Sequence, residues 1–200
     1  MTSPARLAAI ERTTQETHIK LALYLDDPSK LELNTGLPFF DHMLHALACH
    51  GQFGLVVNAT GDTHVDPHHL IEDTGIVLGD AFRQALPGYS AIQRAGCFRF
   101  PMDGTLADVA LDLCGRPNLV WEATFGPHTI GGLDPNLFRE FFKGWVDGAR
   151  ATLHVRLVSL DNDHHGVESI FKAFSRSLRQ AVTPIALAAA LSTKGCLDTH

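Results

Sequence analysis

The sequence lacks several features that would identify common classes of protein. None of its apolar runs approaches the roughly 20 residues that a membrane span requires, and the longest one near the C-terminus, PIALAAALS, is far shorter. No apolar segment followed by a cleavage site opens the chain, so we expect no signal peptide. The four cysteines show no CxxC spacing. This argues against a disulfide framework or a thiolate zinc site and favours reduced thiols in a cytoplasmic protein.

Positive charge is also scarce. Sixteen lysines and arginines against 22 acidic residues give a net charge of −6 at pH 7, which gives no reason to expect nucleic acid or an anionic membrane as a partner. Hydrophobic residues make up 45% of the 200 residues, enough for a packed core. Histidine is the residue in excess, because there are 12 and four of them stand in two dipeptides.

The chain repeats one pattern of elements twice. In each copy, apolar residues at helical spacing are followed by a strand-like run, and that run leads into a histidine pair that opens a long amphipathic helix. These elements cover residues 37–51, 53–60 and 67–86 in the first copy, and residues 135–150, 151–160 and 163–182 in the second. Capping side chains precede both long helices: Asp66 before Pro67 at the first helical position, and Asp161-Asn162-Asp163.

Further strand-like segments precede each copy: THIKLALYL and KLELNT in the first, and CFRFPM, LADVALDL and NLVWEATF in the second. Each half reads strand, strand, helix, strand, helix. The predicted fold class is α/β of the α+β type, a tandem duplication of a unit in which helices cover one face of a small mixed or antiparallel sheet. We expect a single domain over residues 1–200, with pseudo-repeats at about 14–92 and 93–195, because no linker composition separates the halves.

Both histidine pairs belong to an HHxxE motif, in DPHHLIED at residues 66–73 and in DNDHHGVES at residues 161–169. Neighbouring residues on a helix point about 100° apart, whereas positions i, i+3 and i+4 share a face. Two adjacent imidazoles therefore cannot easily chelate one small ion, and the economical interpretation is two ions, one for each histidine. A single copy is more often surface polarity, but the repetition favours metal binding by His68, His69, Glu72, His164, His165 and Glu168.

Alignment of the repeats adds one ligand to each set. Setting FFDHM against LFREF places His42 opposite Glu140, each at a similar distance before its histidine pair. Four protein ligands leave two positions of an octahedral ion for substrate or water, as a catalytic metal needs. Imidazole and carboxylate without thiolate suit manganese, our first choice, or iron, and do not exclude zinc.

Four other histidines compete for these roles, although a structural role is the better interpretation of each: His45, His50, His64 and His154. His45 lies about one turn after His42. His154 lies in a strand, where its two alternative roles are metal ligand and core residue. The remaining histidines carry no pattern and are assigned to loops or surfaces: His18, His128 and His200.

Four long segments occur in order along the chain: PFFDHMLHALACHG, DPHHLIEDTGIVLGDAF, NDHHGVESIFKAFSRSLRQA and the terminal LSTKG. Together they resemble the imidazoleglycerol-phosphate dehydratase family, from about Glu16 to Gly195. The resemblance implies dehydration of imidazole glycerol phosphate to imidazole acetol phosphate in histidine biosynthesis, with two Mn²⁺ ions that bind and activate the imidazole ring. It also implies a fold like domain 2 of ribosomal protein S5, and a homo-oligomeric 24-mer with active sites at subunit interfaces.

The resemblance divides the metal ligands into two sets. One ion takes His42, His69, His164 and Glu168, and the other takes His68, Glu72, His165 and the residue at position 140. In the family a histidine often precedes the paired aromatics, whereas this chain has Glu140. A carboxylate there would make the site harder and more anionic, and His154 is the substitute if Glu140 does not coordinate.

The resemblance also implies the residues that contact the substrate. Glu16 of ETHIK matches the family's carboxylate at the substrate and is our candidate for the group that transfers the proton. From the sequence alone, the better interpretation of Glu16 is an exposed charge at a strand edge. The phosphate needs cationic and hydroxyl donors, and the matching positions are Arg94, Arg116, Lys172, Ser192 and Lys194. The catalytic set is Glu16 with His42, His69, Glu72, His164 and Glu168.

Two other functions are compatible with a pair of metal ions. One is a dinuclear metallohydrolase that attacks an ester or amide, and the other is a metal-storage or metal-stabilised assembly protein. The phosphate-binding set, without an evident pocket for a peptide or nucleotide, favours the lyase over the hydrolase. The terminal STKG is not a P-loop, because the glycine-rich cradle is missing.

Overall fold

The computed structural model describes residues 5–186, 191–193 and 197. Each half of the chain contributes a four-stranded mixed sheet, ordered β1-β2-β4-β3 in the first half and β5-β6-β8-β7 in the second. The strands are β1 (Leu7–Thr13), β2 (Thr17–Tyr24), β3 (Leu31–Asn34), β4 (Gly54–Gly61), β5 (Ala95–Met102), β6 (Thr105–Asp112), β7 (Asn118–Glu122) and β8 (Thr152–Ser159). In both sheets only the short third strand runs parallel to its neighbour. The identical order confirms the predicted tandem duplication.

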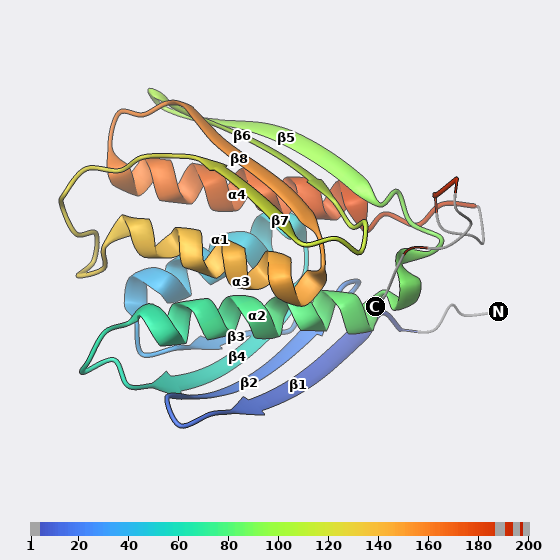
Figure 1. The fold of residues 1–200 in the computed structure, drawn as a ribbon, viewed down its shortest axis with the longest axis horizontal. Coiled ribbons are helices and arrows are strands. Elements are labelled where there is room, and N and C mark those ends of the chain that lie inside the picture. Colours follow the sequence, from blue (N-terminus) through green and yellow to red (C-terminus); the bar gives the residue numbers. More distant parts are fainter. Residues whose placement is uncertain (1–4, 187–190, 194–196, 198–200) are drawn as a thin grey trace.

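Four helices lie between the two sheets (Figure 1). They are α1 (Pro38–Gly51), α2 (His68–Ala85), α3 (Phe138–Ala149), which follows a short 3₁₀ turn, and α4 (Asp163–Ala181). Their bounds agree with the predicted helices to within one turn. The predicted cap of α4 is present, because Asn162 accepts a hydrogen bond from the backbone N–H of His165. Helix α2 begins at His68, one residue later than predicted, and Asp66 makes the capping contact by accepting from the backbone N–H of His68.

One strand, β1, was not predicted. It pairs antiparallel with β2 along its whole length. Its sequence, LAAIERT, does not alternate between apolar and polar residues, and only Ala8 in it is buried. The pairing with β2 forms this strand, and the strand carries little local signal of its own.

The two halves interlock through their helices. The long helix α2 covers β1 and β2 of its own sheet, and α4 covers β5 and β6 of the other. The short helices make their main helix contact with the opposite repeat, α1 with α4 and α3 with α2. Each long helix therefore has beside it a short helix from the other half of the chain.

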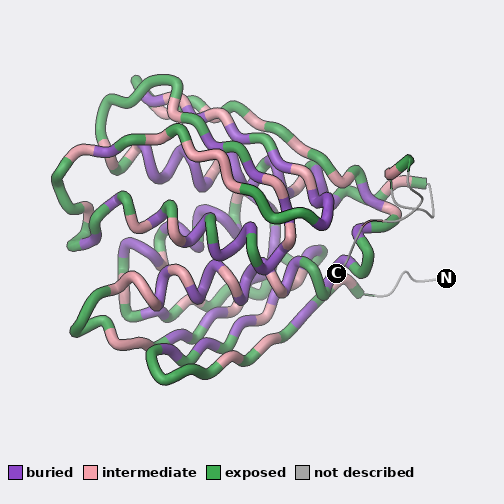
Figure 2. Tube along the Cα trace, in the orientation of Figure 1, coloured by how far each residue is buried: buried purple, intermediate pink, exposed green. Residues whose placement is uncertain are grey.

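Aromatic side chains form the centre of the core between the layers. Figure 2 shows buried residues along the inward sides of the helices and sheets. Ring centroids are 5.6 Å apart for Phe40 and Phe141, and 4.8 Å apart for Trp145 and Phe174, in edge-to-face geometry. These residues belong to the predicted helical segments 37–51, 135–150 and 163–182, and all of them are buried. No helix in the described part of the chain has the length and apolar character to cross a membrane.

Glycines allow α2 and α3 to approach very closely. A Cβ at Gly75 would overlap the carbonyl oxygen of Phe141, and a Cβ at Gly144 would overlap that of Glu72. Four glycines line the contact: Gly75 and Gly79 on α2, and Gly144 and Gly148 on α3. The absence of their side chains brings Glu72 against the backbone of α3.

Replacing Gly75 by alanine should lower the free energy of unfolding by about 1–3 kcal/mol, the usual cost of forcing atoms into a packed contact. The added methyl group meets backbone, which cannot rotate away as a side chain does. Denaturant unfolding of the metal-free protein measures the effect. The exposed Gln84→Ala on the same helix is the control and should stay within about 0.5 kcal/mol of the parent. Equal stability of the two variants would contradict a tight contact.

Candidate metal centre

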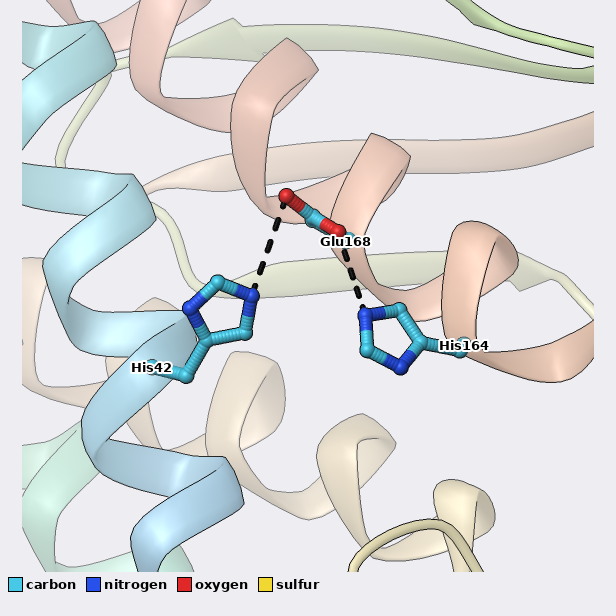
Figure 3. Close-up of side chains that lie close together, drawn as sticks. All are labelled: His42, His164 and Glu168. Carbon is cyan, nitrogen blue, oxygen red and sulfur yellow. Dashed lines mark ion pairs between the residues drawn. The ribbon is translucent and has the colours of Figure 1, made fainter.

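The first candidate metal cluster joins α1 to α4. Glu168 is buried and lies between two imidazoles (Figure 3). Its Oε1 is 3.8 Å from Nε2 of His42, and its Oε2 is 3.3 Å from Nε2 of His164. His164 and Glu168 share a face of α4, as the i, i+4 spacing predicts. His42 reaches them because α1 packs against the long helix of the other repeat.

The second cluster joins α2 to α3. Nε2 of His68 is 3.5 Å from Oε2 of Glu72, and Glu140 in the first turn of α3 completes the group. Each cluster thus takes two residues from an HHxxE motif and one from the short helix of the opposite repeat. The structure gives Glu140 the place in its cluster that His42 has in the first, as the alignment of the repeats predicts.

The geometry of both groups suits a divalent cation. In each, the three ligand atoms lie within 4.8 Å of one another. Ligand bonds of about 2.0–2.2 Å place neighbouring ligand atoms roughly 3–4 Å apart, so small side-chain rotations complete the approach. The donors are imidazole nitrogen and carboxylate oxygen, without sulfur, as manganese and similar ions accept.

Cationic side chains lie beside the carboxylates. Nζ of Lys172 is 2.9 Å from Oε1 of Glu168. Burial raises the pKa of Glu168, but Lys172 together with the rings of His42 and His164 lowers that pKa below its usual value on balance. In the second cluster, Arg139 contacts Glu140 at 2.7 Å and Lys143 approaches Glu72 at 3.6 Å.

The second histidine of each pair lies outside both clusters. The two rings of a pair are nearly perpendicular, at 77° for His68 and His69 and at 88° for His164 and His165. Independently of these ring angles, neighbouring positions on a helix point about 100° apart, so the two histidines of a pair face different directions. Among the described residues, each cluster therefore brings together three of the four ligands that the family resemblance implies.

Carboxylates surround both outlying histidines. Nδ1 of His69 lies 3.1 and 3.2 Å from the two oxygens of Asp62, and its Nε2 lies 3.8 Å from Oε1 of Glu16. The hydrogen bond to Asp62, with the charge of Glu16, raises the pKa of His69 above its usual value. Nδ1 of His165 lies 3.3 Å from both oxygens of Asp161. Hydrogen bonding, first from Thr105 and then from His165, lowers the pKa of Asp161 to about 2.

The structure separates the predicted phosphate-binding residues between two ends of the molecule. Lys172 lies at the end that holds the clusters. Arg94 donates hydrogen bonds to both carboxylate oxygens of Asp112, at 2.7 and 3.0 Å, and its backbone N–H donates to the carbonyl of Ala181. Ala181 ends α4, which has 19 residues. At 1.5 Å per residue, the 17 steps from Ala181 back to His164 place Arg94 roughly 26 Å along the helix from His164.

Other predicted phosphate-binding residues lie with Arg94. The carbonyl of Arg116 accepts a hydrogen bond of 3.2 Å from Thr152, the first residue of β8, whose far end leads to the histidine pair. Ser192 follows Leu191, whose carbonyl accepts a hydrogen bond from the Arg94 guanidinium. Lys194 lies outside the described residues.

The competing histidines take no part in the two clusters. His154 is exposed on β8 between the buried Leu153 and Val155, so it points away from the helices, into a hollow on the outer face of the second sheet. His50 packs edge-on against Phe100, with ring centroids 5.4 Å apart, and burial lowers its pKa. Glu140, rather than His154, therefore lies with His68 and Glu72.

Asp62 is the residue at the site that the sequence did not indicate. It directly follows β4, in a loop of six residues that also supplies the helix cap. The sequence does contain a pattern that could have indicated Asp62: an aspartate follows the strand before each histidine pair. Asp161 occupies the comparable place after β8. Asp161 itself was noted only as a capping side chain.

The fold and the site define a duplicated α/β protein with two histidine–carboxylate clusters between its repeats. The family model for imidazoleglycerol-phosphate dehydratase matches residues 35–178. The imidazoleglycerol-phosphate dehydratase of Lactiplantibacillus plantarum is 49% identical over 178 residues, 89% of this chain and 92% of that protein. That of Limosilactobacillus fermentum is 46% identical over 193 residues, 96% of this chain and all of the relative.

Solved structures agree with the sequence comparisons. The imidazoleglycerol-phosphate dehydratase of Staphylococcus aureus superposes with a TM-score of 0.81 at 37% identity, over 90% of this chain and 99% of that one. The Pyrococcus furiosus protein, in complex with (S)-C348, gives 0.83 at 36% identity, over 94% of this chain and the whole of the other. The chain belongs to the imidazoleglycerol-phosphate dehydratase family and is a lyase of histidine biosynthesis.

Proposed function

We propose that this chain removes water from imidazole glycerol phosphate to give imidazole acetol phosphate, with two metal ions at the clusters described above. The observation that carries the proposal is the pair of matching clusters, each built across the contact between the two repeats. These two groups take corresponding positions of the two repeats, whereas the other histidine–carboxylate group of the described residues, Asp103 with Asp161 and His165, has no such counterpart. Membership of the family supplies the class of substrate.

Each metal ion would have three ligands from one copy of the chain and a fourth from a neighbouring copy. His42, His164 and Glu168 would hold one ion with His69 of a second copy, and His68, Glu72 and Glu140 would hold the other with His165 of a second copy. We propose Mn²⁺ because all donors are imidazole or carboxylate. Bound there, the two ions would supply Lewis acidity toward the imidazole ring and a template that orients it.

Glu16 is the proposed group for proton transfer. The hydrogen lost in this dehydration is on a carbon that no carbonyl acidifies, so its removal needs a positioned base. Glu16 lies at the turn between β1 and β2, with half of its side chain exposed and Oε1 3.8 Å from Nε2 of His69. A carboxylate is thus available beside one of the proposed ligands.

The distance between the two ends supports an active site shared between copies. Arg94 lies a full helix length from His164 in one chain, whereas only a three-carbon chain joins the ring and the phosphate of the substrate. We therefore propose that the phosphate lies against Arg94, Arg116, Ser192 and Lys194 of one copy while the ring lies at the metal end of another. This arrangement requires a homo-oligomer, which we propose is the cytoplasmic 24-mer that the family resemblance implies.

Chelation tests the metal dependence of both turnover and assembly. Removal of the metal should abolish formation of the ketone and shrink the particle, because ligands from different copies no longer share an ion. Activity assays and size-exclusion chromatography with and without EDTA measure the two effects, and added Mn²⁺ should restore both. An unchanged elution volume would argue against metal-dependent assembly, and unchanged turnover would argue against a catalytic metal.

A further inference from the structure

We propose that Asp62 is a positioning residue that fixes the ring of His69 so that Nε2 is presented to a metal ion. The inference deepens the proposed function and rests on it, since His69 acts there as a ligand. Asp62 acts through His69 and is not proposed to touch the substrate. The contacts of Asp62 determine which nitrogen of the His69 ring carries the proton and in which direction the ring faces.

The contacts of Asp62 select one tautomer of His69. The two oxygens of the carboxylate lie 3.1 and 3.2 Å from Nδ1, and both hydrogen bonds to Nδ1 in the described part of the chain come from them. An ionised carboxylate only accepts, so Nδ1 carries the proton and Nε2 of the neutral ring keeps its lone pair. Metal-binding histidines are commonly held in this way by a carboxylate on the other nitrogen.

The backbone of Asp62 is itself fixed to the sheet. Asp62 directly follows β4, whose last residue, Gly61, pairs with Thr17 at the start of β2. Its N–H donates to the carbonyl of Glu16 at 3.1 Å, and its carbonyl accepts from Val65 at 2.8 Å. One residue therefore holds the ring of a proposed ligand and the backbone of the proposed proton-transfer group. It sets where Nε2 of His69 and the Glu16 carboxylate lie relative to each other.

The second repeat brings a carboxylate to the same ring atom by a different route. Asp161 approaches Nδ1 of His165 at 3.3 Å with both oxygens and stands four residues before it, whereas Asp62 stands seven residues before His69. Loops of different length thus end in the same contact. The amide nitrogen of Asn162 also lies 2.8 Å from Nδ1 of His165, a donor that competes with the carboxylate, so the proposal is confined to Asp62.

Manganese affinity of the full-length protein tests the proposal, with Mn²⁺ alone as the probe and a chelating indicator as competitor. Asp62→Asn keeps the size of the side chain but allows either tautomer, and should weaken Mn²⁺ binding about 10–100-fold. Asp62→Glu keeps a carboxylate and should recover part of this loss. The matched control is Asp66→Asn in the same loop, whose carboxylate accepts from a backbone N–H. It should leave the affinity close to that of the parent, even if the helix cap weakens.

The possible results of this experiment distinguish the role of Asp62 from the proposed function. A selective loss in Asp62→Asn, with an unchanged far-UV spectrum and partial recovery in Asp62→Glu, supports the proposal. Parental affinity in Asp62→Asn overturns it, as does an equal loss in Asp66→Asn, because the conformation of the loop would then explain both. Absence of Mn²⁺ binding to the parent also overturns it. A parent that binds Mn²⁺ but forms no ketone refutes the proposed function alone and leaves the result for Asp62 standing.

Discussion

Replacing Glu168 by glutamine should reduce turnover of imidazole glycerol phosphate on the order of a thousandfold or more. The neutral amide keeps the shape of the side chain but removes the anionic oxygens that lie between His42 and His164. A thousandfold loss corresponds to about 4 kcal/mol at 1.36 kcal/mol for each factor of ten, within the several kcal/mol that a catalytic metal ion contributes. Bound metal should fall in parallel.

The measurement is turnover and metal content of the purified variant at saturating Mn²⁺. Thermal unfolding is recorded beside it, because the change also leaves Lys172 without its carboxylate partner. The control is Glu122→Gln, which removes an exposed carboxylate paired with Arg156 at 3.3 Å on the outer side of the second sheet. That variant should keep its metal. A Glu168→Gln protein with full metal content and turnover within tenfold of the parent would contradict the assignment of the first cluster.

Two inactive variants should restore activity when they assemble together. Glu168→Gln damages the metal end of a copy, and Arg94→Ala damages the end that is proposed to bind phosphate. If each active site takes its metal end from one copy and its phosphate end from another, random mixing in a symmetric oligomer leaves about a quarter of the sites with both ends intact. Activity should therefore rise from near zero to about a quarter of the parental value.

In the mixing experiment, each variant is first dissociated with chelator. Equal amounts of the two variants are then combined and reassembled with Mn²⁺. The matched control mixes Glu168→Gln with His164→Ala. Both of these changes damage the same cluster, so no complete site can form and activity should stay low. Native mass spectrometry verifies that mixed particles are present. Mixed particles of the first pair without recovered activity would contradict a site shared between copies.

Features of the fold and the site that depend on local spacing of residues were predicted correctly from the sequence. Glu72 and Glu168 lie on the helix faces of His68 and His164 because a helix brings i and i+4 together. The correspondence of His42 with Glu140 came from repeated sequence, and the structure shows it as equivalent places in two clusters. The helices were predictable because their apolar residues recur at helical spacing, and aromatic residues of these segments such as Phe141 and Phe174 are buried.

The remaining features depend on tertiary contacts. No local pattern shows that α1 packs against α4, or that glycines bring α3 onto α2. The contact of Asp62 with His69 depends on the path of a loop, which polar residues alone do not indicate. In the sequence Arg94 and Lys172 formed one phosphate-binding set. Only the fold shows that the long helix α4 separates Arg94 from the metal end.

Formation of imidazole acetol phosphate from imidazole glycerol phosphate is the direct test of the proposed function. Purified protein is loaded with Mn²⁺, mixed with the substrate and assayed for the ketone, with a chelated sample and a phosphate-release assay in parallel. We expect the ketone to form with Mn²⁺ and not after chelation, and we expect no release of phosphate. Folded, Mn²⁺-saturated protein that forms no ketone would refute the proposed dehydration, and release of inorganic phosphate in its place would identify a hydrolase.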